Sequence, residues 1–226
     1  MHIGTNVEMR QSLDFTRDGA VLREGAISPA DLTRLDQIAP AGAGRRLSLA
    51  GFEGPLQRLT ALAAQTLGPS AMPVRAVLFN KTAEANWALG WHQDRVITVE
   101  RRIEVPGFGP WTRKDGQLHV TPPMSVLEGM ITLRAHLDPC GPDNAPLKVA
   151  LGSHRLGRVA AGEAAEAAAG LPVIDCLAER GDIWIYSTPI LHASDRARRP
   201  AARRVLQLDY AAATLPDGLT WAGIGL

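Results

Sequence analysis

Two histidine–aspartate pairs in the chain have a spacing that suits a metal site. His92 and Asp94 lie in the run GWHQDR, and His136 and Asp138 lie in the run LRAHLDP. Alternate side chains of a β-strand point to the same face, so either pair could reach a single ion. Two neutral imidazoles and one carboxylate on one side of a metal are typical of non-haem iron(II) sites, because the other side stays open for oxygen and substrate.

The residues around the two pairs differ, although the spacing does not choose between them. Asp138 leads into the run PCGP, which is typical of a turn and indicates that this pair ends a core strand. His92 follows a stretch rich in polar and aromatic residues, 80–91, which suits a site better than a core. These contexts favour His92 and Asp94, and the other pair remains an alternative.

A third ligand would have to come from a distant strand, and His192 is the candidate. It follows the apolar run IWIYSTPIL, where a lone histidine is usually a core residue. Ser194 and Arg203 favour a site, because a dicarboxylate co-substrate beside the metal needs a cation for its far carboxylate. The planar guanidinium of arginine pairs with a carboxylate through two hydrogen bonds. Arg204 should point away from the side that Arg203 faces, since neighbouring residues of a strand alternate.

The elements that must position these residues are short strands preceded by helices. Residues 12–24 indicate a short strand, and helices are expected from Ser28 to about Ile38 and over residues 54–67, each with typical start or stop residues. Many short apolar runs separated by Pro, Gly, Asn and Asp are typical of a β-sandwich or barrel. The predicted strands are 74–80, 130–137, 147–151, 172–177, 182–187 and 203–211, with one short helix at 163–169.

The segment 96–124 is charged and rich in glycine and proline. A connection of this length in a compact domain is usually functional or disordered, so we interpret it as a loop or lid on the substrate side. Its basic residues favour a small molecule that bears a carboxylate or another anion: Arg101, Arg102, Arg113 and Lys114. The alternative is a solvated loop whose charges are balanced by Glu100, Glu104 and Asp115. His119, near its end, is expected to be an exposed loop residue.

Composition and charge are those of an ordinary globular protein, with 46% hydrophobic and 21% charged residues and a net charge of +1. The length of 226 residues suits one domain, 1–226. The small net charge predicts neither a nucleic-acid nor a membrane partner. No apolar run approaches the ~18 residues of a membrane helix, and two cysteines fit a reducing compartment, so we expect a cytoplasmic protein. The oligomeric state is not predicted.

Several motifs occur in an order that resembles a known family. They are GWHQD, then DNAPLKVALGSHRLG, then LHAS, with RR opening the last strand. Together they resemble the phytanoyl-CoA dioxygenase family of iron(II)- and 2-oxoglutarate-dependent oxygenases. The opening DFTRDGAVLREGAISPADLTRL is also similar to that family, so the resemblance extends from about Asp14 to Tyr210.

The resemblance implies a mainly β fold, the double-stranded β-helix (a jelly roll, or cupin-like fold), with N-terminal helices packed on one sheet. It implies iron(II) held by His92, Asp94 and His192, with 2-oxoglutarate and oxygen as co-substrates. It assigns the far carboxylate of 2-oxoglutarate to Arg203, assisted by Ser194. Because the DNAPL and GSH motifs lie between the metal aspartate and the distal histidine, His136 falls on a core strand.

Further residues are candidates for contacts within the site. Arg134 is expensive to bury unpaired, so it is expected to meet an acid of the protein or of a substrate. Aromatic candidates are also explained by packing alone. The remaining candidates are Asn80, Lys81 and Thr132 for 2-oxoglutarate, and Trp87, Arg95, Trp111, Arg113 and Arg134 for a substrate.

The expected activity is hydroxylation of an unactivated C–H bond in a small molecule, with release of succinate and carbon dioxide. Related halogenases carry a small residue in place of the metal carboxylate, so the retained Asp94 favours oxygenation. No stretch is an obvious coenzyme A site, so the family name does not identify the substrate. The alternatives are a cupin-like metal enzyme that does not use 2-oxoglutarate, for which Arg203 would have no role, and a non-catalytic binding module, against which the intact triad argues.

Overall fold

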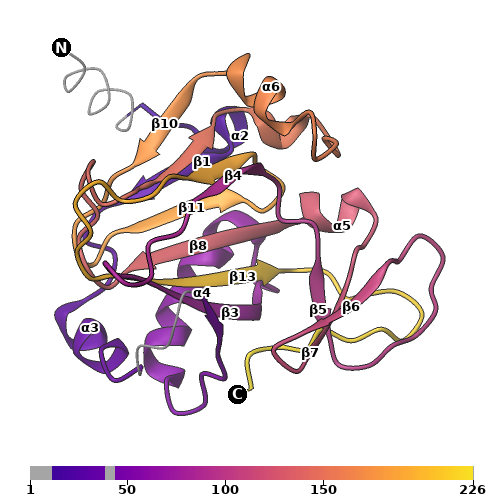
Figure 1. Cartoon of the computed structure of the whole chain (residues 1–226). Coiled ribbons are helices and arrows are strands. Elements are labelled where there is room, and N and C mark those ends of the chain that lie inside the picture. The colour runs from indigo at the N-terminus through magenta and orange to yellow at the C-terminus, as the bar shows by residue number, and fades with distance from the viewer. Residues whose placement is uncertain (1–11, 39–43, 226) are drawn as a thin grey trace.

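The computed structural model describes residues 12–38 and 44–225, and its main feature is a six-stranded antiparallel sheet (Figure 1). This large sheet has the order β1 (Ala20–Arg23), β11 (Ile183–Ser187), β8 (Met130–His136), β13 (Arg203–Ala211), β3 (Met72–Lys81) and β2 (Arg45–Arg46). A small sheet has the order β10 (Val173–Cys176), β9 (Leu147–Ala150), β12 (His192–Ser194) and β4 (Leu89–His92). A third sheet has the order β5 (Ile97–Val99), β7 (Gln117–Val120) and β6 (Trp111–Lys114).

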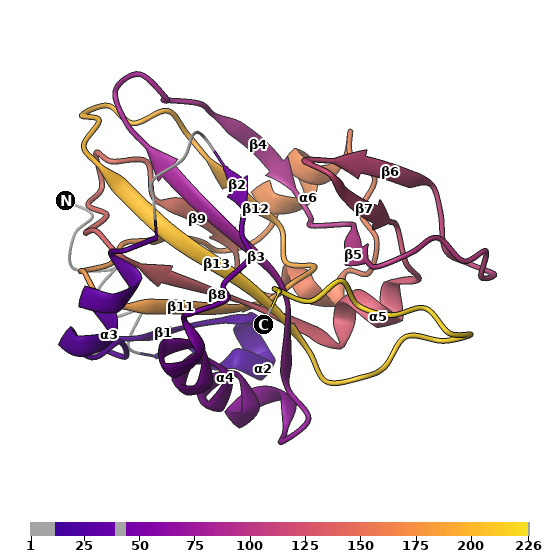
Figure 2. The same cartoon turned by 90° about the horizontal axis from the view of Figure 1, so that it is seen from below.

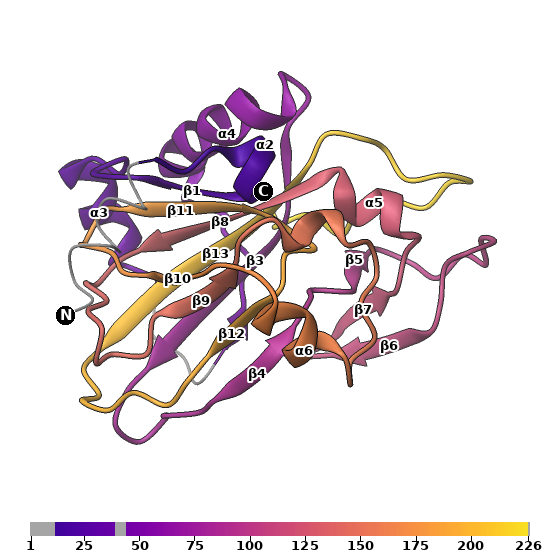
Figure 3. The same ribbon diagram turned by 90° about the horizontal axis from the view of Figure 1, so that it is seen from above.

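From β3 onward the chain passes back and forth between the large and the small sheet. Strands β3, β8, β11 and β13 belong to the large sheet, and β4, β9, β10 and β12, which alternate with them, belong to the small one. Figure 3 shows the small sheet as a layer beside the large one. This alternation is that of a double-stranded β-helix and confirms the predicted jelly roll, although the sheets do not close into a barrel.

The two faces of the large sheet carry different kinds of side chain. On β13, Leu206, Leu208 and Tyr210 belong to the core beneath the helices. Arg203 and Gln207 face the opposite way and line a cavity between the two sheets. Because side chains alternate along a strand, the run RRVLQLDYA supplies both an apolar outer face and a polar inner face.

The N-terminal helices cover the outer face of the large sheet, as predicted (Figure 2). Helix α3 (Pro29–Leu35) begins after Ser28, whose hydroxyl accepts a hydrogen bond from the Asp31 amide at 3.2 Å, and it ends three residues before Ile38. Helix α4 (Glu53–Leu67) buries Leu56, Leu59 and Ala63 against the sheet. The other helices are α5 (Met124–Glu128), α6 (Ala164–Ala169) and the 3-10 turn Ser153–Arg155.

Residues 12–24 begin with a helical turn, α2 (Phe15–Asp18), and only then form β1. The Asp14 side chain accepts a hydrogen bond from the Arg17 amide at 2.8 Å, which starts the turn. Gly19 ends it with a positive φ of 76°, a conformation that favours glycine. The expected short strand therefore occupies only the second half of this range, because local capping outweighs the apolar pattern in the first half.

Segment 96–124 is built around the third sheet rather than an irregular loop. Val99, Val105, Leu118 and Val120 form a separate core with residues of the C-terminal segment that include Leu219. Its strands have only three or four residues, and β6 is largely exposed, so the sequence shows little periodicity there. Among the described residues, no helix is long and apolar enough to cross a membrane.

Candidate metal centre

His92, Asp94 and His192 come together at the end of the small sheet. Strands β4 and β12 are antiparallel neighbours, and their register places His192 opposite His92. The two imidazole centroids are 4.2 Å apart, and the potential ligand atoms of all three residues lie within 4.8 Å of one another. No other group of three or more His, Cys, Asp or Glu side chains within residues 12–38 and 44–225 has this geometry.

Hydrogen bonds to the backbone orient both imidazole rings. Nδ1 of His92 is 2.7 Å from the carbonyl oxygen of Gly90, and Nδ1 of His192 is 3.0 Å from that of Ile190. A proton on each Nδ1 leaves each Nε2 with a free lone pair, which is the usual arrangement of metal-binding histidines. Burial lowers the pKa of His192 to about 4 despite the nearby Asp94, so this ring is neutral at physiological pH.

The Asp94 carboxylate is held by residues of the large sheet. Arg75 Nη2 and Gln207 Nε2 lie 3.4 and 3.5 Å from Asp94 Oδ2. Burial raises the pKa of Asp94, but Arg75 and then the two histidines outweigh it and bring the pKa below its usual value. Two imidazoles with their Nε2 atoms available and an ionised carboxylate therefore fit a divalent metal ion.

Arg75 is itself anchored by a buried acid that sequence reasoning did not single out. Its Nε donates to Asp209, which also accepts a hydrogen bond from Thr132 Oγ1 at 2.9 Å and one from Gln207 Nε2 at 3.2 Å. Thr132, a candidate for 2-oxoglutarate, is thus used within the protein. A usable signal was present, because Arg203, Gln207 and Asp209 are an even number of residues apart on β13 and face the same side.

The metal triad opens into a cavity of about 410 Å³, within the usual range for small-molecule sites. It contains seven of the predicted site residues, which are His92, Asp94, His192, Ser194, Arg203, Trp87 and Arg134. Residues that the sequence analysis missed also line it, including Arg46, Arg75, Val77, Phe79, Leu89 and Gln207.

Arg203 is buried at one end of this cavity with no carboxylate as a partner. Its Nη1 donates to the carbonyl oxygens of Asn144 and Ala145 and lies 3.7 Å from Cys140 Sγ. Its Nε is buried without a hydrogen-bond partner. Ser194 also lines the cavity. The guanidinium therefore retains donor capacity for an anion.

Arg134 does not meet an acid of the protein, which corrects one of the two expectations for it. Its Nη1 donates to Gln207 Oε1 at 2.8 Å, and its guanidinium carbon lies 5.0 Å from the centre of the Phe79 ring. No carboxylate of the described residues lies within ion-pair distance of it.

Two candidates on β3 lie outside the lining of the cavity. Lys81 is completely buried, and its Nζ donates to the Asp195 carbonyl at 2.7 Å and to Ser194 Oγ at 3.3 Å. Lys81 therefore lies outside the cavity and holds the side chain of Ser194, which lines it. Asn80 pairs with Arg204 in the register of β3 and β13, so it shares the outer face with that residue.

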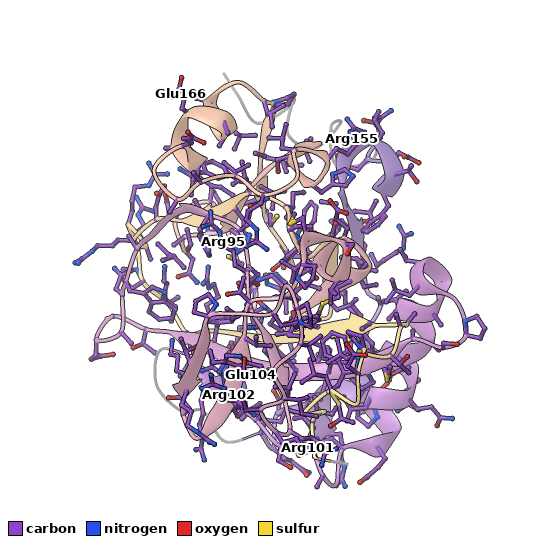
Figure 4. The ribbon with its side chains drawn as sticks, turned by 90° about the vertical axis from the view of Figure 1, so that its right-hand side faces the viewer. Arg95, Arg101, Arg102, Glu104, Arg155 and Glu166 are labelled. Carbon is purple, nitrogen blue, oxygen red and sulfur yellow. The ribbon has the colours of Figure 1, made fainter. Side chains whose placement is uncertain are left out.

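The other three candidates also lie outside the lining. Arg95 donates to the carbonyl oxygen of Val159, and Trp111 lies beside Arg102, whose guanidinium carbon is 5.5 Å from the ring centre. Arg113 is exposed. Figure 4 shows Arg101 and Arg102 away from Arg95, with Glu104 beside Arg102. Of the basic residues of segment 96–124 that favoured an anion, only Lys114 lines the cavity.

His119 is buried, so its expected exposure was wrong. Its Nε2 accepts a hydrogen bond from Arg46 Nε at 3.1 Å, and Arg46 Nη1 pairs with Asp115 Oδ2 at 2.5 Å. These contacts join the β6–β7 hairpin to β2 at the edge of the large sheet. Because Arg46 and Lys114 both line the cavity, the third sheet forms part of its wall.

The alternative pair has a structural role. His136 is buried on β8, apart from the triad, and burial lowers its pKa to about 3. Asp138 accepts hydrogen bonds from Arg204 Nε and Nη2 at 2.9 and 2.7 Å. This geometry agrees with the position on a core strand that the resemblance implied.

A jelly roll in which two histidines and one aspartate line a cavity defines a class of metal-dependent proteins. Within that class, the family model for phytanoyl-CoA dioxygenase (PhyH) matches residues 15–205, and the chain belongs to this family. No curated protein shows a significant sequence match to the chain.

Several solved structures share the fold. AviO1 from Streptomyces viridochromogenes Tue57 is 20% identical, with 95% of this chain and 96% of that chain covered and a TM-score of 0.62. The epimerase SnoN, in complex with Fe3+, alpha-ketoglutarate and nogalamycin RO, is 14% identical over 99% and 88% of the chains, with a TM-score of 0.65. EctD from S. alaskensis with 2-oxoglutarate and 5-hydroxyectoine is 18% identical over 90% and 75%, with a TM-score of 0.63.

Proposed function

We propose that this protein is an iron(II)- and 2-oxoglutarate-dependent oxygenase that hydroxylates an unactivated C–H bond of a small molecule and releases succinate and carbon dioxide. The observation that carries the proposal is the triad His92, Asp94 and His192 in one cavity with Arg203, a buried arginine that has no acid as a partner. Family membership and similar structures described with iron and 2-oxoglutarate support it.

The three ligands would hold iron(II) through the Nε2 atoms of His92 and His192 and a carboxylate oxygen of Asp94. When bound, the metal supplies oxygen activation coupled to decarboxylation of 2-oxoglutarate. The task of the protein is to present the Nε2 atoms of both imidazoles and an ionised Asp94, which the backbone carbonyls at the two Nδ1 atoms and Arg75 achieve. Holding the reacting groups in fixed positions is the main contribution of such a site to the rate.

The far carboxylate of 2-oxoglutarate would bind Arg203, and the Ser194 hydroxyl would add a hydrogen bond. Arg203 is 3% exposed and contacts only neutral groups, so a carboxylate would offset the cost of burying its charge. Lys81 donates to Ser194 Oγ, and the Ser194 hydroxyl itself makes only long contacts of 3.4 and 3.5 Å with the carbonyl oxygens of Ala145 and Asp195, which a carboxylate would replace.

The outcome of the reaction depends on how the substrate lies. A similar structure is described as an epimerase and another contains 5-hydroxyectoine, so one fold serves more than one outcome among those proteins. Asp94 occupies the position that a halide would need, which favours transfer of oxygen over halogenation.

The test is an anaerobic titration of the protein with iron(II) and 2-oxoglutarate, followed by visible absorption. Chelation of the metal by 2-oxoglutarate is expected to produce a weak charge-transfer band. His92→Ala should abolish the band, and His136→Ala should retain it if circular dichroism shows a folded protein. A folded wild-type protein without the band would contradict the proposal.

Arg203 separates this function from that of a cupin-like enzyme that does not use 2-oxoglutarate. Arg203→Met should weaken 2-oxoglutarate binding by at least about tenfold, because a buried charged hydrogen bond contributes about 1.5–3 kcal/mol. The same variant should still bind the metal. If 2-oxoglutarate affinity is unchanged, the co-substrate is bound elsewhere or is not used.

A further inference from the structure

The space between the two main sheets contains more buried positive than negative charge. Four buried cationic side chains face it from the large sheet, which are Arg75, Lys81, Arg134 and Arg203, against the two carboxylates Asp94 and Asp209. Arg46 of β2 also lines the cavity, but its charge is paired with Asp115. A divalent metal and a doubly charged 2-oxoglutarate offset each other. Two positive charges therefore remain after both have bound.

The excess of positive charge helps to lower the pKa of two of these cations. Burial lowers the pKa of Arg203, and the Arg134 charge lowers it further. Burial, followed by the Arg203 charge, lowers the pKa of Lys81 to about 8. A further anion in the cavity would relieve both effects.

Arg134 and Arg75 form an internal comparison, because both are buried guanidinium groups that line the same cavity. Arg75 is paired with Asp209 and lies 3.4 Å from Asp94. The side-chain oxygen that Arg134 contacts belongs to Gln207, a neutral amide. A buried charge without a counter-ion is unfavourable, so a cation left unpaired at a cavity wall indicates a ligand with the opposite charge.

The far carboxylate of 2-oxoglutarate does not account for Arg134. Arg134 lies opposite Gln207 on β13, four residues from Arg203, which is a rise of about 13 Å along the strand. The two side chains are thus attached at different levels of the sheet, although the Arg134 charge still acts on Arg203. Gln207 also lies 3.5 Å from Asp94, so an anion at Arg134 would be next to the metal ligands.

Much of the remaining wall is apolar or aromatic, although Arg46, which is paired with Asp115, and Lys114 also line it. Val77, Phe79, Trp87 and Leu89 line the cavity together with the triad. A ligand that satisfies both this wall and Arg134 combines a carboxylate with an apolar body.

We propose that Arg134, oriented by Gln207, binds the carboxylate of the substrate, and that the substrate is a small carboxylic acid with an apolar body. This inference rests on the proposed function, since it takes the metal and Arg203 to be occupied by 2-oxoglutarate. It makes Arg134 a residue that determines specificity, separate from the residue that binds the co-substrate.

The test uses protein loaded with nickel(II) and saturating 2-oxoglutarate, so that no turnover occurs. The probes are benzoate, phenylacetate and cyclohexanecarboxylate, each compared with its neutral amide by calorimetry and thermal shift. At least one acid should bind about tenfold or more tightly than its amide, the ratio expected for one charged hydrogen bond. If the wild-type protein binds no acid more tightly than its amide, the proposal is overturned.

Two variants assign the effect to Arg134. Arg134→Met should remove the preference for the acid and leave 2-oxoglutarate affinity within about threefold, and Arg134→Lys should keep part of the preference. Removing an unpaired buried charge should also leave the thermal midpoint equal or higher, which a purely structural arginine would not do. A tenfold loss of 2-oxoglutarate affinity, or an unchanged preference in Arg134→Met, would overturn the assignment.

The proposed function and the inference about the substrate can be disproved separately. If iron(II) and 2-oxoglutarate give no visible band in the wild-type protein, the proposed function fails. If the band forms in the wild type and in Arg134→Met but acids and amides bind alike, only the inference about the substrate fails.

Discussion

Asp209 illustrates how much of the site is determined by residues that touch no ligand. It is 1% exposed and accepts hydrogen bonds from Arg75, Thr132 and Gln207. Arg75 and Gln207 in turn contact the Asp94 carboxylate. The position of Asp94 therefore depends on the buried acid Asp209, which acts on it through these two residues.

Asp209→Asn is therefore expected to lower the free energy of unfolding by about 3–5 kcal/mol, because it leaves the buried Arg75 charge without its main partner. Urea unfolding followed by circular dichroism measures the change. Asp195→Asn is the matched control, since its ion pair with Lys148 is largely exposed and should contribute under about 1 kcal/mol. Equal losses in the two variants would contradict this account of the buried pair.

Lys81 makes stability depend on pH in the alkaline range. Its pKa is about 8 in the folded protein, because of burial and the Arg203 charge, and 10.5 is the ordinary value. Between these values the unfolded chain holds a proton that the folded chain has released, so stability should rise with pH from about 8 to about 10.5. Lys81→Met should raise the thermal midpoint at pH 7 and reduce this rise. Lys148→Met, a surface control, should change neither quantity.

At the scale of elements, turns decide where the short N-terminal elements begin and end. Gly19 ends α2 with φ 76°, and a Cβ added there would overlap the His154 ring. Gly25 has φ 57° but open space around it.

Gly25→Ala should thus cost about 1–2 kcal/mol from backbone strain alone. Gly19→Ala should cost a further 1–3 kcal/mol or so, because the new methyl group meets a packed side chain. Chemical denaturation of the two variants gives the comparison. A loss in Gly19→Ala that is no larger than in Gly25→Ala would show that His154 moves away without cost.

At the scale of the whole molecule, three buried histidines in separate parts of the fold contribute to acid sensitivity. His119 lies in the third sheet, His136 on β8 and His192 at the metal centre, with pKa values of about 4, 3 and 4. In each case burial is the main cause of the lowered pKa. The unfolded chain takes up these protons near pH 6.5 and the folded chain does not, so stability falls as the pH drops below about 6.5.

The metal-free protein should consequently melt at a lower temperature at pH 5 than at pH 7.5, which differential scanning calorimetry measures. His136→Gln should make this dependence shallower, because it removes one of the three groups. If the midpoint is the same at both pH values, these histidines are not buried in neutral form.

The amino-acid sequence by itself determined the predicted helices and the six predicted strands, because periodicity and capping are local. The family resemblance likewise depended only on motifs in order. Periodicity did not predict β4 and β12, which carry the two histidines of the candidate metal site, since strands of four and three residues show no repeating pattern.

Only the tertiary structure decided which side chains meet. The two histidine–aspartate pairs have the same local spacing, and the register that places His192 opposite His92 is a contact between residues a hundred positions apart. The same is true of Arg134, whose burial could be inferred from its apolar strand but whose partner could not. Local sequence dictates which face of a strand a residue occupies, whereas the neighbour of that strand is set by long-range pairing, which is why Gln207, and not an acid, lies opposite Arg134.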